Sequence, residues 1–101
     1  MRNIGREELL ATLASLRPVF EQGGVKHLVL FGSRARAGNR PDSDIDLMIE
    51  VDENKKFSLL DLVGVGHIIE DNFGLEASVV MRRSISPRFA QETQKDLIEV
   101  F

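Results

Sequence analysis

A glycine–serine pair followed by arginines has the composition of an anion-binding site. Gly32 and Ser33 follow an apolar run, and a glycine at such a turn lets backbone N–H groups and a hydroxyl approach an anion closely. Three arginines, Arg34, Arg36 and Arg40, lie within seven residues of a chain whose net charge is −3. Guanidinium groups match phosphate oxygens well. The segment predicts a phosphate-binding turn; the alternative is an ordinary glycine turn with a solvated basic loop.

Two aspartates follow Ser33 after a gap of ten residues. Asp44 and Asp46 alternate with apolar residues, so an extended strand would project both carboxylates from one face, with roughly 7 Å between their Cα atoms. Carboxylates that close repel each other unless a cation lies between them. Mg²⁺ held by one or two carboxylates and substrate phosphates suits this pair and serves phosphoryl-type displacement. The alternative for the pair alone is the solvated face of an edge strand.

The composition excludes several other kinds of site. The chain of 101 residues has no cysteine, which excludes disulfides, thiol nucleophiles and thiolate zinc sites, and its two histidines, His27 and His67, are isolated. The net charge of −3 argues against direct nucleic-acid binding. No apolar run reaches the ~18–20 residues of a membrane span, and no secretory signal is present at the N-terminus. We expect one cytoplasmic domain over residues 1–101, without membrane contact.

Helix and strand patterns alternate along the chain and must position these residues. The expected strands are residues 25–31, 44–51 and 75–81. Helical spacing predicts an amphipathic helix over residues 6–22, with Pro18 kinking it or opening its last turn, and a second helix between a capping box at Ser58 and Gly74. A final helix is expected from Ser86 to Phe101. This order predicts an α/β (α+β) fold, a small mixed sheet of three to four strands packed against helices.

Together, the glycine–serine turn and the aspartate pair resemble the signature of the DNA polymerase β-like nucleotidyltransferases, which is Gly-Ser, ten residues, then Asp-x-Asp. Gly32-Ser33 and Asp44-Ile45-Asp46 match it with the required gap. The chain length and the runs Phe31 to Arg36 and Ser43 to Leu47 resemble in particular the minimal nucleotidyltransferases, MntA-type antitoxins paired with HEPN-domain toxins. This resemblance implies a polymerase β-like nucleotidyltransferase fold.

The resemblance also implies roles for individual residues. Gly32 and Ser33 would hold the phosphates of ATP, Arg36 would help neutralise them, and Asp44 and Asp46 would bind Mg²⁺. The implied reaction is in-line attack of an acceptor hydroxyl on the α-phosphate, with pyrophosphate leaving. In the antitoxin branch the acceptor is a tyrosine of the HEPN toxin, which forms a complex with the antitoxin and is silenced by AMP.

The chain departs from the family pattern at two positions. The family's third carboxylate is expected where this chain has Ser78, whose hydroxyl is uncharged at neutral pH and a poor base. Glu76 shares the face of Ser78, but a displacement of roughly 7 Å exceeds the reach of one extra methylene. Ala37 also stands where the family usually has glycine, so a differently shaped loop is expected.

These departures leave three hypotheses open. The first is a Mg²⁺-dependent transferase whose acceptor comes from a partner protein, because 101 residues leave no room for an acceptor domain. The second is a weak or inactive nucleotidyltransferase fold that binds nucleotide and neutralises its partner by contact. The third is a structural domain unrelated to nucleotides.

Overall fold

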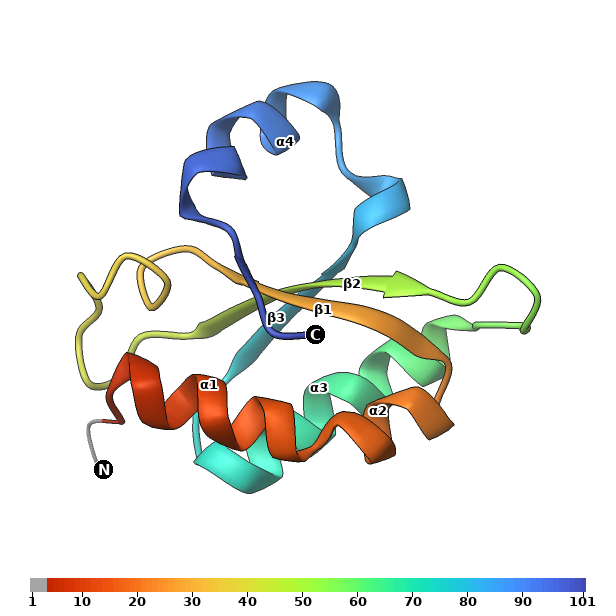
Figure 1. Cartoon of the computed structure of the whole chain (residues 1–101), viewed down its shortest axis with the longest axis horizontal. Coiled ribbons are helices and arrows are strands. Elements are labelled where there is room, and N and C mark those ends of the chain that lie inside the picture. The colour runs from red at the N-terminus through yellow and green to blue at the C-terminus, as the bar shows by residue number, and fades with distance from the viewer. Residues whose placement is uncertain (1–3) are drawn as a thin grey trace.

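A four-stranded mixed sheet forms the centre of the protein, and helices cover both of its faces (Figure 1). The computed structural model describes residues 4–101. The strands are β1 (Val25–Phe31), β2 (Ile45–Val51), β3 (Ala77–Met81) and β4 (Ile98–Glu99). In the order β3-β2-β1-β4, β1 runs antiparallel to both of its neighbours, whereas β2 and β3 are parallel. The predicted small mixed α+β fold is confirmed.

Three helices cover one face of the sheet and bury the main hydrophobic core. They are α1 (Arg6–Ser15), α2 (Arg17–Gln22) and α3 (Leu59–Phe73). Alternation along β2 directs every second side chain into this core, namely Ile45, Leu47, Ile49 and Val51. They pack with Leu9 and Leu13 of α1 and with Ile69 of α3. Because strand side chains alternate between faces, burial of this set directs Asp46 to the opposite face.

The opposite face carries a smaller core under the C-terminal segment. This segment contains η1 (Arg82–Ser84), α4 (Pro87–Thr93) and η2 (Gln94–Asp96). Val29, Phe31 and Met48 are buried there, with Phe89 of α4 packed against them. The rings of Phe31 and Phe89 meet edge to face, with centroids 5.6 Å apart. The small core anchors α4 next to the row of the sheet that holds Asp46.

The boundaries of the first three helices follow local signals, but the first two replace one predicted helix. The expected single helix over residues 6–22 is two helices that break at Leu16, with Pro18 in the first turn of α2. In the first turn of a helix a backbone N–H has no acceptor within the helix, so the N–H that proline lacks costs nothing there. Inside a continuous helix, a proline would remove a hydrogen bond. Ser58 and Asp61 form the predicted capping box of α3, which ends at Gly74 in a left-handed conformation. No helix within residues 4–101 has the length and apolar character needed to span a membrane.

The prediction of one helix from Ser86 to Phe101 is wrong beyond Thr93. The chain instead returns to the sheet as β4, which pairs Ile98 with Leu30 of β1, and the N–H of Leu28 donates to the carbonyl of Phe101 at 3.1 Å. This pairing satisfies backbone groups on the edge of β1 that would otherwise be open, a long-range gain that helical spacing cannot reveal. The return of the chain also brings η2 close to the turn that follows β1.

Candidate active site

The turn after β1 is a single compact loop built around Gly32. The carbonyl of Gly32 accepts hydrogen bonds from the N–H groups of Ala35 at 3.1 Å and Arg36 at 3.2 Å. The N–H of Gly38 then closes the turn on the carbonyl of Ser33 at 2.9 Å. Gly32 itself has φ +78°, a left-handed conformation that strongly favours glycine. The sequence GSRARAG therefore folds into a tight turn directly at the end of a buried strand.

Ala37 adopts the backbone conformation that glycine favours. Its φ is +60°, and it is the one non-glycine residue with positive φ among those that the structure describes. A left-handed conformation costs an alanine about 1–2 kcal/mol. The turn accepts this cost and still closes through Gly38, so the missing glycine at position 37 does not open the loop.

The sheet places Asp46 directly against Gly32. Asp46 of β2 pairs with Phe31 of β1, which puts its side chain next to the first residue of the turn. A Cβ atom added to Gly32 would collide with Oδ2 of Asp46 and would lie 3.1 Å from its Cγ. Only a glycine can therefore stand at position 32 while the carboxylate keeps its place. The predicted phosphate turn and the predicted carboxylate meet at one end of the β1–β2 pair.

Asp44 and Asp46 form a closely coupled carboxylate pair. Asp44 is exposed and lies one residue before β2, so the predicted start of this strand is one residue too early, whereas Asp46 is half-buried within it. Burial raises the pKa of the Asp46 carboxyl above its usual value, the charge of Asp44 raises it further, and the charge of Arg36 opposes both. A charged Asp46 therefore lacks sufficient counter-charge in the protein alone. A bound divalent cation would supply it.

Ser78 lies beside Asp46, at the position where the family resemblance implies a third carboxylate. In the parallel β2–β3 pair, Ser78 is the direct partner of Asp46. Glu76 lies two residues before Ser78, just ahead of β3, and is exposed. Its backbone carbonyl accepts a hydrogen bond from the N–H of Ile45 at 2.9 Å. Among residues 4–101, no three acidic or histidine side chains gather closely enough to hold a metal by themselves. Glu76 thus does not complete a three-carboxylate site in this structure.

Arg34 is a structural residue, which corrects its place in the predicted phosphate loop. Only 1% of it is exposed. Its guanidinium donates to the carbonyls of Ser43 at 3.0 Å, Pro41 at 3.1 Å and Ile4 at 3.4 Å. Burial lowers the pKa of Arg34, and the nearby charge of Asp42 opposes that effect. Three carbonyl groups need donors at this point, so Arg34 ties the turn to the segment that leads to Asp44.

Arg34→Ala is expected to destabilise the protein by about 3–4 kcal/mol, because the carbonyls of Ser43 and Pro41 lose their donor and a cavity remains. Urea denaturation measures this change. Arg40→Ala is the matched control, because Arg40 is an exposed arginine of the same loop, and its effect should stay within about 0.5 kcal/mol. Equal stability of the two variants would contradict the structural role of Arg34.

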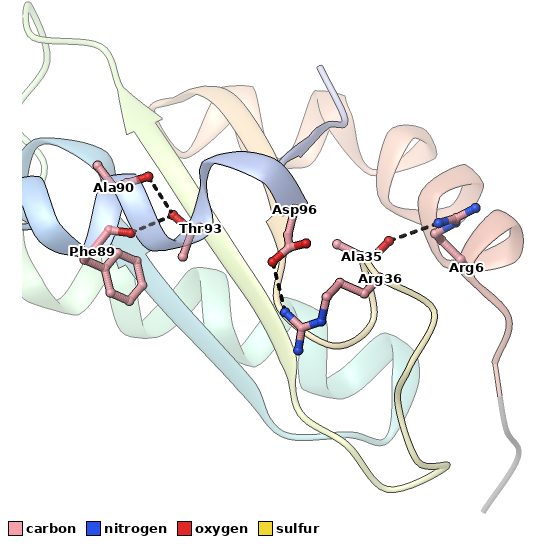
Figure 2. Close-up of polar contacts among 7 residues, drawn as sticks. All are labelled: Arg6, Ala35, Arg36, Phe89, Ala90, Thr93 and Asp96. Carbon is pink, nitrogen blue, oxygen red and sulfur yellow. Dashed lines mark hydrogen bonds and ion pairs between the residues drawn. The ribbon is translucent and has the colours of Figure 1, made fainter.

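Arg36 is the arginine of this turn that stays accessible next to Asp46. Its side chain is 53% exposed, and its NH1 donates to Oδ2 of Asp96 at 3.1 Å (Figure 2). On the other side of the turn, Arg6 of α1 donates from its NH1 to the carbonyl of Ala35 at 3.0 Å (Figure 2). Sequence reasoning missed Arg6 and Asp96, since each is far from the turn in sequence and carries no motif. The turn is thus held from the N-terminal and C-terminal parts of the chain at once.

Comparisons with known proteins agree with this geometry. A family model described as "Nucleotidyltransferase domain" matches residues 8–100. A Methanocaldococcus jannaschii protein named "Putative protein adenylyltransferase" is 36% identical over 83 residues, which are 82% of this chain and 87% of that protein. A solved structure described as a "putative minimal nucleotidyltransferase" superposes with a TM-score of 0.81 at 26% identity, covering 97% of this chain and 98% of that one.

The structure also resembles, more distantly, one chain of a two-protein complex. That complex joins a tri-AMPylated HEPN toxin from Shewanella oneidensis to an MNT antitoxin. The TM-score is 0.69 at 14% identity, with 95% of this chain and 71% of that chain covered. At this identity the likeness shows a shared fold.

Proposed function

Because this chain belongs to the nucleotidyltransferase domain family, we propose that it transfers AMP from ATP to a hydroxyl of a partner protein. The observation that carries the proposal is the contact between Gly32 and the Asp46 carboxylate. It joins a turn suited to phosphates and an acidic residue suited to a metal in one small space. The sheet and its covering helices also support the prediction that residues 1–101 form one domain.

The phosphate side of the site consists of the turn that follows β1. Gly32 lets the backbone approach a ligand closely, and Ser33 provides a hydroxyl at the next position. Arg36 provides a cation that is half exposed and close enough to act on Asp46. We assign the binding of the ATP phosphates to Gly32, Ser33 and Arg36.

The metal side of the site consists of Asp44 and Asp46. Their carboxylates are hard oxygen donors, and the raised pKa of Asp46 indicates that a cation would stabilise its charged form. Two carboxylates together with substrate phosphates suit Mg²⁺, which keeps much of its coordination for water and phosphate. Bound there, Mg²⁺ would supply charge neutralisation and Lewis acidity to the triphosphate. We therefore assign Asp44 and Asp46 as its ligands and as the catalytic carboxylates.

The acceptor hydroxyl comes from a partner in this proposal. Its oxygen forms a bond to the α-phosphorus, the bond to the bridging oxygen breaks, and pyrophosphate leaves. The hydroxyl proton leaves to water, because Ser78 offers no carboxylate beside Asp46. The fold shared with a chain of that toxin–antitoxin complex, in which the HEPN toxin is AMPylated, supports a HEPN-domain toxin as the partner and an antitoxin role for this protein. We assign a tyrosine of the toxin as the acceptor on the basis of the motif resemblance alone.

The test is to mix the purified protein with ATP, Mg²⁺ and a HEPN-domain toxin from the same genome, and to weigh both proteins by intact-mass spectrometry. We expect the toxin to gain the mass of AMP. Asp44→Asn should remove this gain, whereas Asp71→Asn, which changes an exposed aspartate of α3, should leave it intact. Complex formation without any gain in mass would contradict the transferase proposal.

A second candidate function is favoured by the position of Ser78. With serine beside Asp46, the protein would bind nucleotide and neutralise its partner by contact, without rapid transfer. Ser78→Asp distinguishes the two functions, because an added carboxylate should raise a measurable transfer rate about 10-fold or more. The matched control is Ser84→Asp, an exposed serine beyond the end of β3. A protein that only binds because it lacks this carboxylate should transfer no AMP as wild type or as Ser84→Asp, and should gain transfer only in Ser78→Asp.

A further inference from the structure

Arg36 and Asp96 form an ion pair that joins the turn after β1 to the C-terminal segment. They are 60 residues apart in sequence, and NH1 of Arg36 lies 3.1 Å from Oδ2 of Asp96 (Figure 2). The side chain of Asp96 is 14% exposed, whereas that of Arg36 is 53% exposed. The carboxylate is thus the sheltered member of the pair, and the guanidinium is the accessible one.

The backbone that carries Asp96 is anchored by the residues that follow it. Asp96 ends η2, the next residue, Leu97, packs in the small core with Phe31, and Ile98 then pairs with Leu30. These contacts tie Asp96 to the last residues of β1, from which the phosphate turn begins. The backbone of Arg36 is fixed in turn by its bond to the Gly32 carbonyl at 3.2 Å.

The pair leaves most of the guanidinium available to a ligand. One nitrogen of Arg36 contacts Asp96, whereas a guanidinium carries five N–H donors. The backbone of Arg36 is bonded to Gly32, and the Asp46 side chain lies against that glycine. A flexible arginine without a fixed partner would turn toward Asp44 and Asp46 and compete with a cation there.

We propose that Asp96 is a positioning residue, which holds Arg36 beside the turn so that its free N–H groups meet the ATP phosphates and stay off the metal-binding carboxylates. This inference rests on the proposed function. It assigns to the C-terminal segment a part in nucleotide binding, although Asp96 itself does not touch the nucleotide. The stabilisation comes from ordering Arg36 before the ligand arrives, which lowers the entropic cost of binding.

The test is a double-mutant cycle on the full-length protein, read out as the Kd for a non-hydrolysable ATP analogue with Mg²⁺ by titration calorimetry. We expect Arg36→Ala to weaken binding about 10- to 100-fold. Asp96→Ala should weaken it about 3- to 10-fold, which is the loss from one side chain that must now be ordered on binding. In the Arg36→Ala background, Asp96→Ala should have no further effect, because it acts through Arg36.

Further measurements separate positioning from a structural role. Asp96→Ala should raise the KM for ATP while kcat for AMP transfer at saturating ATP stays within about 2-fold, and Asp96→Glu should restore part of the affinity. Asp71→Ala is the control for loss of one negative charge. Tighter binding in Asp96→Ala would show that Asp96 competes with phosphate, and independent, multiplying effects of the two substitutions would show a structural role. Either result overturns the inference.

The binding measurements distinguish failure of the proposed function from failure of this inference. Absence of analogue binding by the wild-type protein would overturn both the proposed function and this inference. Wild-type binding that is equal in Asp96→Ala would overturn the inference alone.

Discussion

Asp46→Asn is expected to slow AMP transfer strongly and, at the same time, to make the protein more stable. Loss of the carboxylate should lower the transfer rate by about 10²–10³-fold, because charge that stabilises the reacting phosphates is removed. The charge of Asp46 lowers the stability of the folded protein, since burial and the charge of Asp44 both disfavour the ionised carboxylate. We expect a gain in unfolding free energy of about 0.5–1 kcal/mol. Intact-mass kinetics and thermal unfolding measure the two effects.

The stability gain of Asp46→Asn should depend on pH in a defined direction. The pKa of Asp46 is raised in the folded protein, so the wild type loses stability as the pH rises from the ordinary carboxyl pKa through the folded value. Below both pKa values the carboxyl is protonated in either state, and the difference between the variant and the wild type should vanish. Asp71→Asn, at an exposed position, should show no such trend. An Asp46→Asn variant that melts below the wild type at neutral pH would contradict this account.

Gly32→Ala is expected to disrupt both the fold and the site. The positive φ of +78° costs an alanine about 1–2 kcal/mol, and its collision with the Asp46 side chain adds about 1–3 kcal/mol. Alanine also makes the unfolded chain less flexible, which offsets about 0.4–1 kcal/mol of this loss in unfolding free energy. The net loss in unfolding free energy should be about 2–4 kcal/mol, measured by urea denaturation. Nucleotide binding should be lost as well, because the Cβ occupies space between the turn and the carboxylate.

Two further variants test the cause of this effect. Gly38→Ala is the matched control, because no atom lies within 4 Å of a Cβ built there, and its effect should be within about 0.5 kcal/mol. In Asp46→Ala the carboxyl group that meets the new Cβ is gone, so Gly32→Ala should cost less in that background. Equal costs in both backgrounds would assign the whole effect to backbone conformation and none to the close contact.

The parts of the fold that the sequence predicted are those governed by neighbouring residues. The strand at residues 25–31 and the capped helix that ends at Gly74 were predicted because apolar periodicity, caps and glycines act locally. The final helix was wrong beyond Thr93, because the segment after it gains more from pairing with β1 than from continuing a helix. Strand pairing over about 70 residues leaves no local signal.

The same division holds for the site. The spacing of Gly32-Ser33 and Asp44-Ile45-Asp46 pointed to one site, and the β1–β2 register places Asp46 against Gly32. The family resemblance implied that Ser78 stands where a third carboxylate is expected, and the β2–β3 register places Ser78 beside Asp46. The motif predicts the site because its residues lie just after β1 and at the start of β2. These two strands are antiparallel neighbours, so the end of one lies beside the start of the other.

Arg34 and Arg36 show what the sequence alone determined and what only the tertiary structure decided. The sequence determined that a basic turn follows a buried strand and precedes an acidic pair, because those features follow from residue type and spacing. The two arginines share one local context, yet Arg34 is buried against carbonyls of a neighbouring loop and Arg36 faces Asp96 from the C-terminal segment. A charged side chain takes its role from the groups that surround it in space. Those groups are assembled here by β4 and by the loop before β2, so only the folded chain could separate the structural arginine from the one available to a ligand.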